Sequence, residues 1–582
     1  MKKLFVLLLT FCLCLPLFAA CDNGETTTET KVATTEATTE ITTEATTEKV
    51  TEDPTETTEA EIETKEETEV VEIPTDAPIN PNPNPNPNPN PETSEITETA
   101  ETVTIETTVE EDETLTENED ERVLDIEKNN YKEDFLLSIV PDCNPMDYFW
   151  VEEGEGDAMS EAVYLRQQKV LDHLGVNVVA SNGGNHLTYI ATFRTAVKAM
   201  DGRVDTLISH VSSGLCGLMS DMYLRDFNQM PGIDLDSDYW NRDFMDALSI
   251  SGTKADYYYL GFSNYNILYT YVVAFNKAMM ADYATSLDKS LYEMVNTGEW
   301  TLDQMLALAK LVTFDKTGDG KTVDDTFGLT AQQWVPWIGL LHASNINLVE
   351  MNDKGAYEVV VMSEKYNEKT RELVTKLKEF SASAYGWFEF PEGGTIKGCQ
   401  VPLTSGRALM QLQSTYALVG FLDFDIEFGV RPYPLYDSDQ YEEDTDSHGY
   451  RSLQWGGYLC IPAYTGDEKH TTMVGETLST LAFYSDEVMT TFYEKLLGKK
   501  VADVPDDRKM LDLIWSSVCS DFGQTYTDES GTLYFLPNVT WPGAGGSELG
   551  SYAGSMTTGG NKKLAQFIKV VSKKSDAGVT MK

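Results

Sequence analysis

Residues 22–121 place the strongest limit on what this chain can fold into. The stretch repeats Thr-Thr-Glu and Ala-Thr-Thr-Glu, contains an alternating Asn-Pro tract between Asn80 and Pro91, and holds no aromatic residue. A segment with so little apolar surface does not offset the entropy that is lost on ordering. We therefore expect a disordered linker over residues 22–130 and a folded body over residues 131–582.

The charge supports the same division. The chain of 582 residues has a formal net charge of −52. Residues 22–121 contribute −28, from 31 acidic side chains and 3 lysines, and Lys2 and Lys3 contribute +2, so the body carries −26. An acidic body excludes a nucleic-acid-binding protein, because phosphate is bound by basic surfaces. It also argues against docking on anionic lipid through a basic face, and it fits a neutral ligand better than an anionic one.

The first 21 residues predict export from the cytoplasm. Two lysines precede an apolar run at residues 4–17, which is shorter than the about 20 residues that a membrane-spanning helix needs. The following Phe-Ala-Ala-Cys, ending at Cys21, resembles the lipobox of bacterial lipoproteins, in which the cysteine is diacylated. We expect an extracytoplasmic protein that is lipid-anchored through Cys21 to the outer face of the cell membrane. Ordinary cleavage after Ala20 is the alternative.

The body holds five cysteines that lie far apart in the sequence. Their number is odd and no CxxC pair occurs, so the sequence implies neither a zinc site nor a disulfide framework. We expect buried free thiols at Cys143, Cys216, Cys399, Cys460 and Cys519.

Strand and helix signals alternate along the body. Short apolar runs predict strands, and apolar residues three or four apart predict helices. The predicted strands cover residues 135–139, 176–180, 204–208 and 270–275, and the predicted helices cover residues 160–174, 189–200 and 276–283. This order predicts an α/β fold with a parallel sheet, in which ligands bind beyond the carboxyl ends of the strands. Ser212 and Ser213 follow the third strand and are therefore candidate ligand-binding residues.

The most specific stretch begins at Trp300. Here a predicted helix opens with Thr301 as its N-cap, and an Asp/Gly-rich loop then leads to Phe-Gly-Leu at residues 327–329. Three further segments follow in order at residues 404–418, 428–434 and 455–461. They contain Arg-Ala-Leu-Met and a tyrosine, then Phe-Gly-Val-Arg-Pro, then Trp-Gly-Gly-Tyr. Together these landmarks resemble the family 1 extracellular solute-binding proteins, the maltose-binding-protein-like receptors of ABC importers.

This resemblance covers about residues 131–582 and implies a two-lobed, periplasmic-binding-protein-like α/β fold with a hinge. Lobe 1 is expected at about residues 131–270 and 460–510, and lobe 2 at about residues 271–458 and 511–582. The chain is expected to cross between the lobes near residues 269–274 and 455–461. The implied function is to capture a small-molecule solute, most commonly a mono- or oligosaccharide, and to deliver it to the permeases of an ABC importer.

Aromatic side chains that stack on sugar rings are the expected ligand-binding groups. The resemblance implies cleft-facing positions for Trp334, Trp337, Tyr416 and Trp455. It implies the same for Ser212 and Ser213. Their placement in loops adds Trp150, Tyr265 and Asn266. A single Trp or Tyr is more often part of a hydrophobic core, so burial is the alternative for each of these aromatic residues.

The Asp/Gly-rich loop allows two interpretations. Its first half matches an EF-hand-like calcium loop, but Thr326 stands where a bidentate glutamate is expected, so that Asp324 or Asp325 would have to replace it. The loop is either a solvated turn or a structural calcium site, and no other cofactor is expected. The predicted calcium ligands are Asp315, Thr317, Asp319 and Asp324.

No catalytic motif accompanies these features. The sequence has neither HExxH nor GxSxG, and its six histidines share no metal-ligand spacing. We therefore predict a receptor and not an enzyme. The abundant carboxylates leave a secreted surface glycoside hydrolase as an alternative, and a carbohydrate-binding adhesin without a transport role as another.

Overall fold

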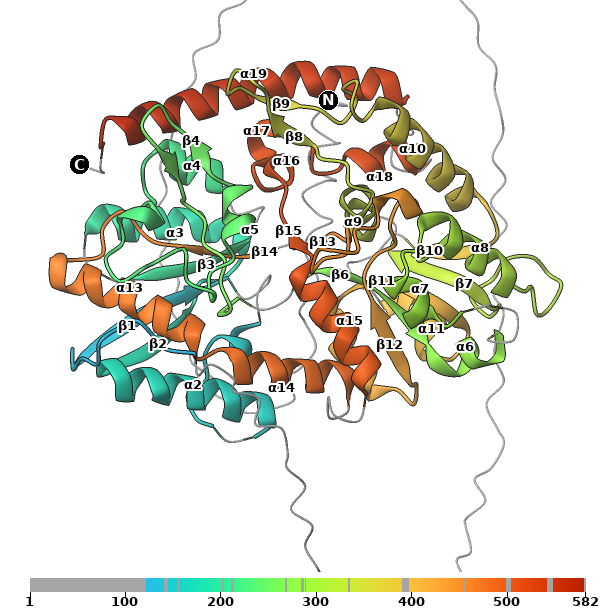
Figure 1. The fold of residues 1–582 in the computed structure, drawn as a ribbon, viewed down its shortest axis with the longest axis horizontal. Coiled ribbons are helices and arrows are strands. Elements are labelled where there is room, and N and C mark those ends of the chain that lie inside the picture. Colours follow the sequence, from blue (N-terminus) through green and yellow to red (C-terminus); the bar gives the residue numbers. More distant parts are fainter. Residues whose placement is uncertain are drawn as a thin grey trace, which may run out of the picture. The chain divides into compact units, whose positions relative to one another are not determined.

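A computed structural model describes most of the predicted body (Figure 1). The described residues are 122–140, 145–154, 156–200, 202, 204–210, 214–266, 269–283, 287, 289–332, 335–389, 397–454, 456–498, 504–541 and 548–579. The predicted signal peptide, Cys21 and the predicted linker up to residue 121 lie outside this set.

The first sheet contains four strands in the order β14-β3-β1-β2. These strands are β1 (Glu133–Ile139), β2 (Val176–Asn182), β3 (Thr206–His210) and β14 (Gly456–Cys460). β1 pairs in parallel with β2 and β3, whereas β14 runs antiparallel to β3. The first three predicted strands are confirmed, with ends that differ by a few residues from the sequence pattern.

Helices surround this sheet, and α2 packs against β2, α13 and α14. The α2 helix begins after Asp157, whose carboxylate accepts the Ser160 N–H at 2.9 Å, and ends at Gly175 with a φ of 66°. The predicted helices at residues 160–174 and 189–200 are confirmed as α2 and α3. The helices are η1 (Met146–Tyr148), α2 (Ala158–Leu174), α3 (His186–Ala199), α4 (Leu215–Ser220), η2 (Phe227–Gln229), α5 (Arg242–Asp246), α13 (Glu468–Phe483) and α14 (Asp486–Leu497).

The second sheet contains five strands in the order β10-β7-β11-β6-β12. These strands are β6 (Tyr271–Asn276), β7 (Phe327–Gln332), β10 (Gly386–Glu389), β11 (Ala408–Ser414) and β12 (Phe428–Arg431). β7 pairs in parallel with β10 and β11, and β6 runs antiparallel to β11 and β12. The strand predicted at residues 270–275 is confirmed as β6.

The helices around the second sheet include α8, which packs on β7 and β11. Its predicted N-cap is confirmed, because the Thr301 hydroxyl accepts the Gln304 N–H at 3.3 Å. The helices are α6 (Lys277–Tyr283), α7 (Leu291–Asn296), α8 (Leu302–Val312), α9 (Val335–Ala343), α10 (Asn367–Ala382), α11 (Lys397–Thr404), α12 (Thr415–Leu418), η5 (Val419–Asp423), η6 (Ser438–Gln440) and α15 (Pro505–Ser516).

The two sheets repeat one arrangement. In each, the first of three parallel strands lies in the middle: β1 lies between β2 and β3, and β7 lies between β10 and β11. In each, an antiparallel strand pairs with the third of these strands. In the first sheet this strand is β14, which is distant in sequence, and in the second sheet it is β6, which precedes β7. We call the first sheet with its helices lobe 1 and the second with its helices lobe 2. The predicted two-lobed α/β architecture is therefore present in the chain's own topology.

Smaller elements connect and cover the lobes. Three two-stranded pairings are formed by β4 (Ile250–Ser251) with β5 (Asp256–Tyr257), β8 (Val349–Met351) with β9 (Tyr357–Val359), and β13 (Ser452–Leu453) with β15 (Val518–Cys519). A helical tail follows, with α16 (Phe522–Thr525), α17 (Thr527–Ser530), α18 (Phe535–Thr540) and α19 (Leu549–Asp576). Figure 1 shows α19, in red, running from above the helices of lobe 2 to above α4 and β4 of lobe 1.

Candidate functional site

The carboxyl ends of the parallel strands of both lobes meet where the chain crosses between them. In lobe 1, His210 at the end of β3 pairs with Gly456 at the start of β14. In lobe 2, Ser414 at the end of β11 pairs with Tyr271 at the start of β6. β14 and β6 both begin directly after a crossing, so both carboxyl edges face the same region. In open α/β sheets this edge is where ligands bind.

The crossings are hydrogen-bonded to each other. Thr270 and Gln454 form an antiparallel bridge. The Tyr269 N–H donates to the side-chain oxygen of Gln454 at 3.0 Å, and the Thr270 hydroxyl donates to the Leu453 carbonyl at 2.7 Å. β15 pairs alongside β13 and adds a third segment. We call residues 269–270, 452–454 and 518–519 the hinge.

Neutral polar side chains end four of the parallel strands at these edges. They are Asn182 of β2, His210 of β3, Gln332 of β7 and Ser414 of β11. Asn182 is exposed, Gln332 is half-buried, and His210 and Ser414 are buried. Amide and hydroxyl groups both donate and accept hydrogen bonds, which matches the hydroxyl groups of an uncharged, polar ligand. The described parts of these edges thus suit such a ligand.

Four predicted ligand residues lie outside the described residues, namely Ser212, Ser213, Trp334 and Trp455. Three of their neighbours in the sequence are described. His210 ends β3, Gln332 ends β7, and Gln454 belongs to the hinge. Tyr416 belongs to α12, which directly follows β11, but its side chain is not among the described ones. The ligand role of these five residues stays a prediction.

Trp337 and Trp150 are used for packing inside the protein. Trp337, on α9, is 0% exposed and makes edge-on contacts with the rings of Phe388 and Trp541, at centroid distances of 5.4 and 5.0 Å. Trp150 is half-buried, and its indole N–H donates to the Val178 carbonyl at 2.8 Å. Trp337 is therefore a core residue and not a ligand-stacking one, because protein covers both faces of its ring.

Tyr265 and Asn266 are also buried, and they fix the segment that leads to the hinge. The Tyr265 hydroxyl donates to the Phe149 carbonyl at 3.0 Å. The side chain of Asn266 accepts the Ser263 N–H at 2.8 Å and donates to the carbonyl of Gly457 in β14. These two residues therefore tie the first crossing to lobe 1.

Sequence reasoning placed Tyr269 at a crossing but did not name this half-buried aromatic residue of the hinge as a ligand-binding residue. Its backbone N–H binds Gln454, and its neighbour Thr270 accepts the Thr415 N–H at 2.9 Å, which places Tyr269 beside the carboxyl edge of lobe 2. The available signal was its position directly before a predicted strand and at the predicted crossing. Tyr269 is the described aromatic residue that we assign to the candidate site.

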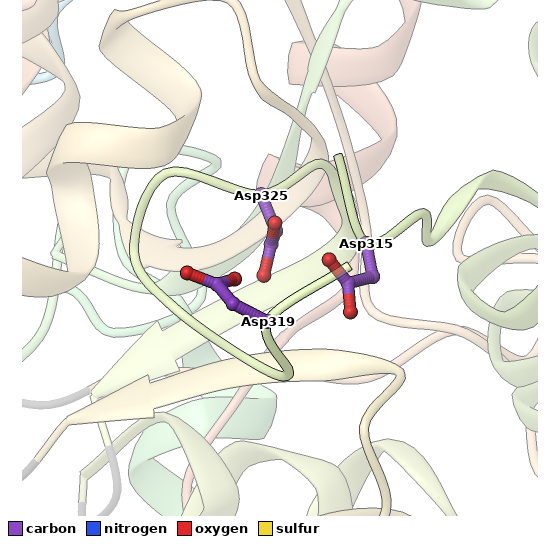
Figure 2. Close-up of side chains that lie close together, drawn as sticks. All are labelled: Asp315, Asp319 and Asp325. Carbon is purple, nitrogen blue, oxygen red and sulfur yellow. The ribbon is translucent and has the colours of Figure 1, made fainter. Parts of the chain in front are cut away.

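The Asp/Gly-rich loop lies between α8 and β7, away from the hinge. Figure 2 shows Asp315, Asp319 and Asp325 turned toward one another, and one carboxylate oxygen of each lies within 4.8 Å of the other two. The third carboxylate is that of Asp325 and not that of Asp324. The Asp324 side chain is 81% exposed and lies 3.6 Å from Nη1 of Arg407.

Groups of the loop itself already bind these carboxylates. Asp315 accepts three backbone N–H groups at 2.6 to 3.2 Å, and the Thr317 hydroxyl donates to Asp319. Asp325 accepts the N–H groups of Thr322 at 2.8 Å and Lys316 at 3.0 Å. These bonds, that of Thr322 first, lower the pKa of Asp325. The loop therefore has its own hydrogen-bonded framework, and a calcium ion there stays a prediction.

Comparisons with known proteins identify similar folds only. No protein-family model matches the sequence, and no curated protein matches it. One similar solved structure is the GacH receptor of Streptomyces glaucescens, solved unliganded and with acarbose, with 15% identity and a TM-score of 0.44 over 75% of this chain and 98% of that one.

Two further solved structures have comparable values. The maltose-binding periplasmic protein MalE of Listeria monocytogenes, in complex with maltose, has 14% identity and a TM-score of 0.44 over 77% of this chain and 99% of that one. A solute-binding protein of Thermotoga lettingae bound with α-D-tagatose has 14% identity and a TM-score of 0.43 over 74% and 100%. At these values the function has to be inferred from the strand order and the crossings of this chain.

In the part of the chain that the structure describes, no helix combines the length and the apolar character that crossing a membrane requires.

Proposed function

We propose that this protein is an extracytoplasmic receptor that captures a neutral carbohydrate between its two lobes and delivers it to an ABC importer. The observation that carries this proposal is that the carboxyl edges of both sheets converge on one hydrogen-bonded hinge. A ligand that contacts both edges would favour approach of the lobes, which is how hinged two-lobed receptors couple binding to closure.

Three features support a carbohydrate as the solute class. The accessible described strand ends, Asn182 and Gln332, offer amide groups, which bind sugar hydroxyls. Tyr269 and the predicted residues Trp334, Tyr416 and Trp455 supply aromatic surface near these ends in the sequence. Residues 122–582, with a net charge of −26 from 38 basic and 64 acidic side chains, disfavour anionic solutes.

The anchor and the transport partner belong to the same proposal. Diacylation of Cys21 would hold the body outside the membrane, with residues 22–121 as a spacer. Mass spectrometry of the protein from its own cells tests this step, because diacylation predicts a lipid-modified Cys21 as the first residue. An unmodified N-terminus at Cys21 would contradict the anchor without affecting carbohydrate binding.

Titration calorimetry of the full chain with a panel of neutral mono- and oligosaccharides tests the central claim. We expect saturable one-to-one binding of at least one sugar, with the sugar recovered intact after prolonged incubation. Accumulation of hydrolysis products would instead identify a glycoside hydrolase. Binding restricted to insoluble polysaccharide would identify an adhesin, and no binding across the panel would contradict the proposal.

Substitution of Tyr269 tests the location of the site. We expect Tyr269→Ala to weaken binding of the sugar found in this panel by about tenfold or more, because a contact aromatic residue is removed. The control is Tyr385→Ala, since Tyr385 is 40% exposed and lies beside α8, away from the hinge. Equal affinities for both variants, with unchanged melting temperatures, would place the sugar elsewhere.

A further inference from the structure

A set of elements that neither sheet requires joins the two lobes on the side of the molecule occupied by α19. The strands of both sheets are complete without the β8–β9 hairpin and without any residue after β15. These additional elements pack on one another, because α19 contacts β9 and α17, and α16 contacts β8. We call the β8–β9 hairpin together with α16–α19 the brace.

The first half of α19 is held on lobe 2. The helix has 28 residues, which corresponds to a length of about 42 Å. Near its start, the amide of Asn538 in α18 donates to the Tyr552 hydroxyl at 2.7 Å, and α18 packs on α9 and α10 of lobe 2.

At its middle, α19 lies directly on the rest of the brace. Asn561 accepts the N–H of Val359 in β9 at 2.7 Å. A Cβ atom added to Gly560 would lie 2.5 Å from the Ser530 carbonyl oxygen and 2.9 Å from the Val359 side chain. Because no side chain fits at residue 560, α19 can lie close to β9 and α17. Together with the buried residues Met556 and Leu564, this makes the first half of α19 an apolar contact.

The last turn of α19 is held on lobe 1 by polar contacts. The Asp576 carboxylate accepts the N–H and hydroxyl of Thr253 at 3.0 and 2.8 Å, the Lys254 N–H at 3.1 Å and the Tyr257 hydroxyl at 3.0 Å. The Ser575 and Tyr259 hydroxyls are 2.7 Å apart. We call the four bonds to Asp576 the latch.

The residues that receive the latch belong to lobe 1. The same segment continues to Gly261, which forms a bridge with Leu459 of β14 at the edge of the first sheet. Within the segment, the Tyr258 carbonyl accepts the Phe227 N–H at 2.8 Å. The β8–β9 hairpin adds one more bond to this side, from the Tyr357 hydroxyl to the Ser249 carbonyl at 2.8 Å.

The brace therefore spans the same two lobes as the hinge, by a separate route. If the lobes separate about the hinge, α19 can stay with only one of them. Both halves of α19 bury apolar side chains, and Phe567 and Val571 are those of the half toward lobe 1. The last turn differs, because Asp576 is half-buried and two of its partners, Thr253 and Lys254, are exposed. Exposed hydrogen bonds exchange with water at low cost, and buried apolar contacts do not.

We propose that α19 is a strap that limits separation of the lobes, and that release of the latch at Asp576 is the first step by which the lobes move apart. This inference rests on the proposed function, since it concerns access to the same cleft. The separation of the lobes without a ligand then depends on the helices α16–α19 as well as on the hinge.

The latch is not a pH switch in the neutral range. Hydrogen bonds, that of the Thr253 N–H first, lower the pKa of Asp576 to about 2. A carboxyl group with a lowered folded-state pKa stabilises the contact above its ordinary value of 3.8 and loses this effect only as the pH falls toward 2. The carboxylate therefore stays ionised, and the latch opens by thermal motion.

Hydrogen–deuterium exchange of the full chain, without any sugar, tests the strap. We expect Asp576→Asn to speed exchange several-fold at two places: the Thr253–Tyr257 segment, and the hinge amides of Tyr269, Thr270 and Gln454. The matched control is Asp512→Asn, because Asp512 pairs with Arg508 within the same helix, α15, at 2.7 Å. This control should leave both places unchanged.

A second variant keeps the test independent of the C-terminal turn. Tyr257→Phe removes one latch donor from the lobe 1 side and should speed hinge exchange in the same direction, by a smaller factor. Faster exchange at Thr253–Tyr257 with an unchanged hinge in both variants would overturn the proposal. Since no sugar is present, a negative glycan panel would contradict the proposed function and leave this result intact.

Discussion

Lobe 1 and lobe 2 share the arrangement of four strands but differ in the charged side chains that they bury. In lobe 1, the Asp205 carboxylate is 0% exposed and lies 2.8 Å from Nε2 of His470, whose Nδ1 lies 2.8 Å from Glu133. In lobe 2, the Arg431 guanidinium is buried between the rings of Phe275 and Trp300, each 4.3 Å away. The titratable histidine pair belongs to lobe 1, whereas stacking of a buried guanidinium occurs in both lobes, since Arg166 of lobe 1 lies 4.5 Å from the centre of the Tyr265 ring.

The difference makes the two lobes respond differently to pH. Hydrogen bonds to Asp205 and then to Glu133, opposed by partial burial, raise the pKa of His470 to about 9. Burial lowers the pKa of Arg431 to about 9, so this group stays protonated below that pH. Between about pH 6.5 and 9, lobe 1 therefore loses a stabilising contribution from His470, whereas the charge state of Arg431 in lobe 2 does not change. A shared arrangement of strands does not imply that the same charged groups are buried.

The largest expected effect comes from removing a buried ring from one lobe at a time. Trp300→Ala should lower the free energy of unfolding by about 3–5 kcal/mol, because the ring is 0% exposed, stacks on Arg431 and donates its N–H to the Pro432 carbonyl at 3.0 Å. Phe135→Ala in β1 should cost a similar amount. Denaturant unfolding measures both, and hydrogen exchange shows which sheet loses protection.

We expect Trp300→Ala to expose the second sheet more than the first, and Phe135→Ala to do the reverse. The control is Phe314→Ala, which should change stability by less than about 0.5 kcal/mol because this ring is 62% exposed. Equal loss of protection in both sheets for either core variant would show that the lobes unfold as one unit. It would contradict the expectation that each variant mainly exposes its own sheet.

The second effect separates the two charge solutions. His470→Gln should lower the free energy of unfolding by about 1–2 kcal/mol at pH 6, a range that allows for solvent screening of this half-exposed group. A group with a raised folded-state pKa stabilises fully below its unfolded value of about 6.5, and this contribution is lost as the pH rises to about 9. Urea titrations at pH 6 and pH 9.5 measure it.

At pH 9.5 the variant and the unmodified protein should therefore have nearly equal stability. The other charged groups that face His470 are Lys469, which pairs with Glu133 at 2.7 Å, and Asp467, which accepts the His470 N–H at 2.9 Å. An equal loss at both pH values would mean that the imidazole acts by packing alone.

The smallest effect is expected at the aspartate loop of lobe 2. Because loop N–H and O–H groups already bind Asp315, Asp319 and Asp325, we expect a chelator to leave the melting temperature unchanged. A calcium-dependent rise in melting temperature that Asp319→Asn abolishes would assign a cation to the loop, since binding to the folded state alone is stabilising.

Much of the local structure could be predicted because its causes lie within a few residues. Periodicity located α2 and β6, and Thr301 with Gln304 forms the predicted cap. Strand–helix alternation likewise indicated that the residues after β3 follow a carboxyl end, whereas β7 and β11 were not predicted as strands. It did not reveal that Trp337 is a core residue, because the same aromatic side chain suits a core and a sugar site equally.

The sequence by itself determined the α/β class, the cap at Thr301 and the end of β3, since these depend on short-range spacing and capping. Only the tertiary structure decided that β14 completes the first sheet, that Asp325 and not Asp324 joins the loop, and that Asp576 reaches Thr253. Each of these depends on which surfaces pack together across long stretches of chain. No local pattern encodes that choice, because burial rewards any apolar partner of the right shape.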